Sequence, residues 1–201
     1  MKKIILIPAF LIFAISCKDK GAEYIKIRNS FIESYFSLDF NTFSSKRNEV
    51  ELTKTHKLLE KLVESSVSDE EYFFDLINYR LHIIENERDQ ALNKLNSIKE
   101  INPMMFHFYR GVVLELMDGN QKGSKEQFVK SLEKCNDKFF KLYLNYLIDG
   151  KISSFLKNLG TYDINAQKFY QIIYDSSTGD KDFRNKILIK EVFNNIYLPE
   201  K

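Results

Sequence analysis

Apolar residues recur every three or four positions through most of this chain, and this spacing constrains its fold more than any other feature. Such spacing gives an α-helix one apolar face, whereas a half-buried strand alternates apolar and polar residues. No stretch shows sustained alternation bounded by glycine or Asn-Gly turns. The hydrophobic content of 44% is enough for a sizeable core. We therefore expect an all-α protein.

The same periodicity, together with turn signals, predicts ten helices. Asp118-Gly119-Asn120 and Asp149-Gly150 are typical of loops, and Asn102-Pro103 ends one helix and begins the next. Ser68 to Glu71 has the pattern of a capping box. Short connections between the helices favour antiparallel hairpins. The expected helices cover residues 22–39, 43–65, 69–85, 89–101, 103–117, 122–135, 137–148, 151–159, 164–174 and 181–197.

The N-terminal segment has the pattern of an export signal. Lys2 and Lys3 precede an uncharged apolar run from Ile4 to Ile15. This run is shorter than the roughly 20 apolar residues that span a bilayer. The next residues complete the sequence Ala14-Ile15-Ser16-Cys17, which resembles the lipobox of bacterial lipoproteins.

That resemblance implies a protein held at a membrane by lipid. Residues 1–16 would be a lipoprotein signal peptide, Cys17 would carry the lipid, and residues 17–22 would form a spacer before a single domain at residues 23–201. Lasting attachment needs more than one acyl chain, which a fully modified lipoprotein cysteine provides. We expect the protein in the bacterial cell envelope, at the outer membrane rather than the inner one.

The apparent positive charge of the chain belongs to this signal. The whole sequence has 30 Lys and Arg against 28 Asp and Glu, and removal of residues 1–16 takes away two lysines and no acid. A neutral chain without a basic run offers no field that steers nucleic acid. We therefore expect no nucleic-acid partner.

Residues 72–103 resemble the tetratricopeptide repeat (TPR), a helical hairpin of about 34 residues. Ala91 matches the small residue that opens the second helix of the repeat, and Leu95 matches its large apolar position. Pro103 matches its terminal proline, whereas Asn78 stands where the family has glycine.

Residues 105–136 resemble a second repeat. Gly111 matches the first-helix glycine, Phe128 the second-helix aromatic residue, and Ser131 the late small residue. The resemblance implies TPR-like antiparallel hairpins stacked into a short right-handed solenoid. An irregular helical bundle is the alternative.

The first helices of both repeats carry aromatic and arginine side chains. In the TPR family these helices line a concave groove that binds peptides, and Arg and Tyr are enriched at binding hot spots. The resemblance therefore implies that Arg80, His82, Tyr109 and Arg110 bind a partner. The alternative is that the aromatic side chains belong to the core and the arginines are only solvated.

The remaining polar residues show no catalytic or metal-binding pattern. His56, His82 and His107 lie on three different expected helices, and none is spaced from a second histidine or a preceding glutamate as in a zinc site. With Cys17 lipidated, Cys135 is expected to be a buried small residue rather than a nucleophile. We expect no cofactor, no metal and no enzymatic activity.

These expectations favour a lipid-anchored protein that works by binding. The preferred interpretation is a scaffold or assembly factor that binds a protein or peptide of the cell envelope through a TPR-like groove. The alternative is an immunity-type lipoprotein that neutralises a toxin in the periplasm. A third class is an envelope enzyme or carbohydrate-binding protein that uses the aromatic residues. This class would need a cleft with convergent carboxylates.

Overall fold

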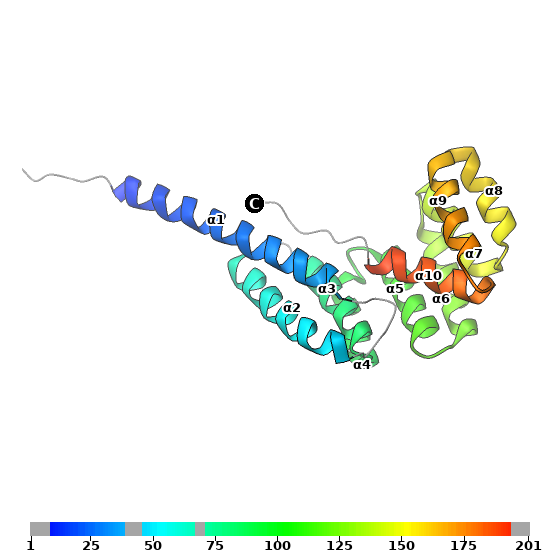
Figure 1. Ribbon diagram of the computed structural model, residues 1–201, viewed down its shortest axis with the longest axis horizontal. Helices are drawn as coiled ribbons and strands as arrows, with labels where there is room; N and C mark the ends of the chain where they lie inside the picture. Colours follow the sequence, from blue (N-terminus) through cyan, green and yellow to red (C-terminus); the bar gives the residue numbers. More distant parts are fainter. Residues whose placement is uncertain (1–8, 39–45, 67–70, 194–201) are drawn as a thin grey trace, which may run out of the picture. The chain divides into compact units, whose positions relative to one another are not determined.

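The computed structural model describes residues 9–38, 46–66 and 71–193, and over these residues the protein is all-helical, without a strand. The prediction of an all-α protein is confirmed, and each expected helix is present with its ends shifted by a few residues, apart from α1, which begins earlier. The helices are α1 (Ala9–Phe36), α2 (Lys46–Ser65), α3 (Glu71–Ile84), α4 (Arg88–Lys94), the short 3-10 helix η1 (Leu95–Ile98), α5 (Pro103–Leu116), α6 (Gln121–Lys134), α7 (Lys138–Asp149), α8 (Ile152–Tyr162), α9 (Ile164–Asp175) and α10 (Asp180–Phe193) (Figure 1).

Cap residues in the sequence set the ends of these helices. The Asn102 side chain accepts a hydrogen bond from the amide of Met105 at 3.1 Å, which satisfies a donor at the start of α5. Gly150 ends α7 with a φ of 73°, a left-handed conformation that glycine adopts without strain. The capping box predicted from Ser68 falls outside the described residues.

α1 is one continuous helix and includes Cys17. Residues 17–22, for which the lipobox implies a spacer, are therefore helical in the full chain. The signal peptide, the lipidated spacer and the single domain at residues 23–201 stay predictions. Among the described helices, none is both long enough and apolar enough to cross a bilayer.

The described residues form two compact units, which divide within α3 between Phe74 and Asp75. The first unit contains α1, α2 and the first turn of α3. The second contains the rest of α3 and all helices to α10.

In the first unit, α1 and α2 run antiparallel. The hydroxyl groups of Ser34 and Thr55 are 2.8 Å apart, and the Ser37 hydroxyl donates to Glu51 at 3.1 Å. A residue later in α1 therefore contacts a residue earlier in α2, as expected for antiparallel helices. The apolar side chains buried in this unit are Tyr24, Phe31, Tyr35, Leu38, Leu52, Leu59, Leu62 and Phe74.

In the second unit, successive helices form antiparallel hairpins. In the α5–α6 hairpin the Ser131 hydroxyl donates to the carbonyl of Met104 at 2.9 Å, and the Ser124 hydroxyl donates to Glu115 at 3.0 Å. α8 and α9 are joined only by Asp163, which caps α9 by accepting from two of its first amides. The short connections predicted from the sequence therefore do produce hairpins.

α5 and α6 approach each other closely at Gly111. A Cβ atom at this position would lie 2.6 Å from the Phe128 ring, which is fully buried. The TPR family has small residues where its helices cross. The residues at three further such positions, Ala91, Ser124 and Ser131, are also buried. These contacts fit the resemblance, and the stacking of the hairpins as a solenoid stays a prediction.

The last helix, α10, packs on α5 and α7. The Tyr143 hydroxyl donates to the carbonyl of Ile187 at 3.5 Å, and the Tyr146 and Phe183 rings meet edge to face with centroids 5.6 Å apart. α10 is therefore part of the core of the second unit. The α10 side chains buried there are Phe183, Ile187, Leu188, Val192 and Phe193.

We expect Gly111→Ala to destabilise the protein by about 1–3 kcal/mol, because the new Cβ overlaps the Phe128 ring and the ring has to move. Gly21→Ala in α1 is the matched control. Nothing lies within 4 Å of a Cβ there, and alanine favours a helix over glycine by about 1 kcal/mol. Urea unfolding followed by circular dichroism measures both variants, and an unchanged midpoint for Gly111→Ala would contradict the close helix approach.

Candidate functional site

Two of the predicted partner-binding residues, Arg80 and Tyr109, lie inside the fold. Each is 4% exposed, and the Arg80 guanidinium donates to the Tyr109 hydroxyl at 3.5 Å. The Tyr79 hydroxyl donates to the carbonyl of Tyr109 at 2.8 Å. Burial raises the pKa of Tyr79 well above its usual value, so this hydroxyl stays protonated and remains a donor. Arg80 and Tyr109 therefore join α3 to α5.

The other two predicted residues lie apart from this buried contact. His82 is half-buried near the end of α3, and Arg110 is exposed on α5. The structure brings Arg80 and Tyr109 together in the core but leaves Arg110 at the surface. Binding of a partner by these four residues stays a prediction.

A cleft of about 810 Å³ lies where the α5–α6 turn, the end of α7 and the start of α10 meet. Glu115 and Arg184 line it and form an ion pair with two hydrogen bonds, one of them 2.7 Å long. Their side chains are only 5% and 11% exposed, and Ser124 donates a further hydrogen bond to Glu115. Loss of one partner from a buried pair costs about 3–5 kcal/mol, so this contact fixes α10 on α5.

Two acidic groups of this cleft, Glu115 and Asp182, have fixed partners. Asp182 accepts from the amide of Thr178 at 2.9 Å and pairs with Lys186 at 2.9 Å. The amide of Thr178 and the ammonium of Lys186 lower the pKa of Asp182. A carboxylate with a lowered pKa is a poor proton donor at neutral pH, so Asp182 suits a structural contact better than acid catalysis.

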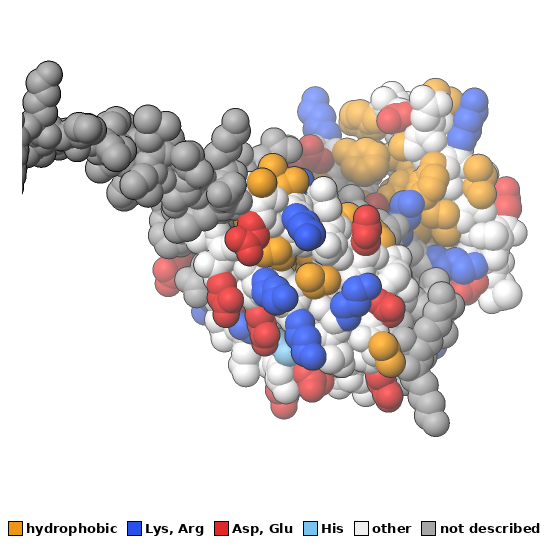
Figure 2. Space-filling view, turned by 60° about the vertical axis from the view of Figure 1, so that its left-hand side comes forward, with side chains coloured by type: hydrophobic (Ala, Val, Ile, Leu, Met, Phe, Trp, Pro, Cys, Tyr) orange, Lys and Arg blue, Asp and Glu red, His pale blue; other side chains and the backbone are white. Residues whose placement is uncertain are grey.

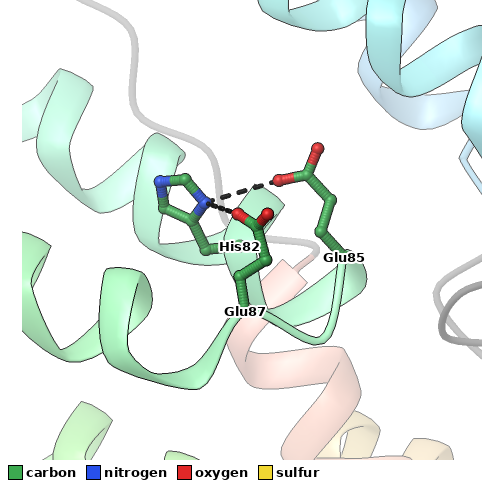
Figure 3. A group of neighbouring side chains, drawn as sticks. All are labelled: His82, Glu85 and Glu87. Carbon is green, nitrogen blue, oxygen red and sulfur yellow. Dashed lines mark hydrogen bonds and ion pairs between the residues drawn. The ribbon is translucent and has the colours of Figure 1, made fainter.

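A second polar group lies at the turn between α3 and α4 (Figure 3). Nδ1 of His82 is 2.8 Å from a carboxylate oxygen of Glu87 and 3.4 Å from one of Glu85. Asn86 between the two glutamates has a φ of 63°, and the Glu87 amide donates to the carbonyl of His82 at 2.7 Å. This left-handed turn brings both carboxylates to the same imidazole nitrogen.

These contacts change the protonation of His82. Half-burial of the ring disfavours its charged form, but hydrogen bonds to Glu85 and Glu87 outweigh this effect and raise the pKa of His82 above its ordinary value. Sequence reasoning missed this group because it looked for a second histidine or a preceding glutamate. The signal present is a histidine followed by glutamates three and five residues later.

α9 carries apolar side chains on two faces. Tyr170 is buried, whereas Ile164, Phe169 and Ile172 are 53%, 38% and 68% exposed. At 100° per residue these three side chains spread over about 140° of the side of the helix away from Tyr170, and the exposed Asn165 and Lys168 lie between them. Sequence reasoning placed a helix here but did not compare its two faces. The pattern could have revealed the second apolar face.

The surface around these features carries charges of both signs. On the face drawn in Figure 2, Lys and Arg side chains alternate with Asp and Glu, and hydrophobic side chains gather toward the part that contains α8 and α9. Isolated exposed apolar residues are ordinary, whereas a large contiguous patch is typical of a binding surface. On α9 the exposed apolar side chains are Ile164, Phe169 and Ile172.

Comparison of the chain with protein-family models, with curated proteins and with solved structures gives no significant match. The function is therefore argued from the residues and their geometry.

We expect the His82 contacts to stabilise the protein below neutral pH. Because the folded-state pKa of His82 is raised, its stabilisation is fully present below the unfolded-state pKa of about 6.5 and is lost as the pH rises through the folded-state value. Unfolding free energies of wild type and His82→Asn, measured in chelator from pH 5 to pH 9, should converge as the pH rises. A difference that does not depend on pH would contradict this assignment.

Proposed function

We propose that this protein is a lipid-anchored protein of the bacterial cell envelope that binds another protein through the exposed face of α9 and serves as a scaffold or assembly factor. The observation that carries the proposal is the exposed apolar face formed by Ile164, Phe169 and Ile172. Burial of these side chains would contribute roughly 25 cal/mol per Å² of apolar area removed from water. An aromatic residue flanked by aliphatic ones is typical of the centre of a protein interface.

A charged side chain of α10 borders these apolar residues. The Lys190 ammonium lies over the Phe169 ring, 3.8 Å from its centroid. Interfaces commonly combine an apolar centre with a polar rim, which supplies specificity. α9 and the neighbouring part of α10 present both.

We also propose that the hairpins α3–α4, α5–α6 and α7–α8 are TPR-like. The close contact of Gly111 with Phe128 and the contact of Tyr79 with Tyr109 between successive first helices support this. α10 lies on α5 and α7, which are first helices in such an arrangement. We therefore place the partner on α9, where Ile164 and Ile172 are more than half exposed and Lys190 of α10 covers part of Phe169.

The membrane anchor in this proposal is Cys17. It follows an uncharged apolar run and a small residue, as in the lipobox, and it lies in the first unit. A lipid at this position would hold the protein at a membrane, where a partner is also confined.

The double variant Phe169→Asp/Ile172→Asp is expected to lose the partner, because it places two charges in the centre of the apolar face. Affinity capture from detergent-solubilised envelopes, scored by mass spectrometry, compares it with wild type. The matched control is Ile101→Asp, which changes an isoleucine of similar exposure, 62%, outside α9. Circular dichroism verifies that all three proteins are folded.

We expect wild type and Ile101→Asp to enrich the same envelope protein. The double variant should enrich this protein at least about tenfold less than wild type does. Equal enrichment by the double variant, or no enriched protein with wild type, would contradict binding through α9.

Cys17→Ala is expected to move the protein from the membrane fraction to the soluble fraction, because the thioether that holds the lipid cannot form. Incorporation of labelled fatty acid and fractionation of the cells measure this. Cys135→Ala is the control, since Cys135 is buried, as the sequence predicts. Fatty-acid label that persists in Cys17→Ala would refute the lipid anchor.

A further inference from the structure

We propose that His82, Glu85 and Glu87 bind a divalent transition-metal ion of the Zn²⁺ type at the turn between α3 and α4 (Figure 3). This inference does not depend on the proposed function. It rests on the convergence of one imidazole nitrogen and two carboxylate oxygens, which are the atoms that coordinate such ions in proteins.

The donor atoms already lie at distances close to those of a metal site. All three are within 4.8 Å of one another, and Nδ1 of His82 is 2.8 Å and 3.4 Å from the two carboxylates. In a tetrahedral site with bonds of about 2.0–2.1 Å, neighbouring ligand atoms are about 3.3 Å apart. Small side-chain shifts would therefore admit an ion between them.

The charges of the group favour a cation of charge two. With a neutral imidazole, the two carboxylates carry two negative charges around one nitrogen, and a divalent ion balances both. A proton on Nδ1 balances only one of them. The metal would take the place of this proton, which is released to solvent, so affinity should rise with pH.

The backbone holds the ligands in place before a metal arrives. His82 lies in the last turn of α3 and Glu85 directly follows the end of this helix, and the left-handed Asn86 directs Glu87 toward them. Directly after Glu87, Arg88 forms hydrogen bonds of 2.7 Å and 2.9 Å with Asp118, which fixes the start of α4. A preorganised ligand set loses little conformational entropy when the ion binds.

The donor set and its exposure select the type of ion. One nitrogen and two oxygens suit Zn²⁺, Mn²⁺ or Co²⁺ better than the thiol-seeking Cu⁺. The His82 side chain is 13% exposed and that of Glu87 is 40% exposed, so the ion can enter from solvent while the imidazole stays mostly covered. Three protein ligands leave a fourth position for water.

Isothermal titration of Zn²⁺ tests the site in the full-length, detergent-solubilised protein after chelator treatment. A Cys17→Ser background removes a thiol that could compete for the ion, and the other cysteine, Cys135, is buried. We expect one ion per chain with a dissociation constant of about micromolar or tighter. His82→Asn and Glu87→Gln should each weaken binding about tenfold or more.

The matched control is His107→Asn. His107 is also half-buried, but its Nδ1 lies 2.9 Å from the amide oxygen of Gln127 instead of a carboxylate. Its loss should leave the affinity for Zn²⁺ unchanged. Equal loss of affinity in His107→Asn and in His82→Asn would overturn the assignment.

A spectroscopic measurement on the unsubstituted ligand set keeps the test decisive if His82→Asn does not fold. We expect Zn²⁺ to shift the imidazole NMR signals of His82 and to leave those of His56 and His107 in place. Absence of Zn²⁺, Mn²⁺ and Co²⁺ binding to the wild-type ligand set, or Zn²⁺ binding without a shift of His82, would overturn the proposal.

Discussion

The packing of α10 on α5 and α7 is the interaction on which the second unit depends. It buries five apolar side chains of α10 and is fixed by the Glu115–Arg184 ion pair, which is almost closed to solvent. Removal of either partner from this ion pair would leave one charge buried without a partner, which strongly destabilises the folded state. α10 therefore contacts residues that lie 44 and 69 positions earlier in the chain, on α7 and α5, and the hairpins of this unit cannot be considered separately from it.

This arrangement decides which surfaces are open to other molecules. α10 packs on α5 and α7, which are the helices that would line a TPR-like groove. Arg80 and Tyr109 are buried in the contact between α3 and α5. The described surface of the second unit includes the exposed apolar side chains of α9, the turn with His82, Glu85 and Glu87, and the cleft beside Glu115 and Arg184. We propose a protein partner for the first and a metal ion for the second. In both cases a local sequence pattern becomes a site only because a helix end or a helix face is left uncovered.

The sequence predicts the helices well and their tertiary roles poorly. Helix positions follow from apolar spacing and from caps such as Asn102 and Gly150, which act over a few residues. Burial of Arg80 depends on Tyr109, 29 residues away, and no local pattern reveals such a contact. The His82 group depends on the left-handed conformation of Asn86, which that residue type permits but does not require. Local rules therefore predict elements, whereas the site depends on long-range contacts and on one backbone angle.

The central claim, that α10 completes the second unit, is tested most directly by hydrogen exchange measured by mass spectrometry. Chains that end after residue 179 lack α10, and chains that end after residue 193 retain it. The account predicts that amides of α5 and α7 lose protection in the shorter chain and keep it in the longer one. Unchanged protection of α5 and α7 in the chain without α10 would contradict the account.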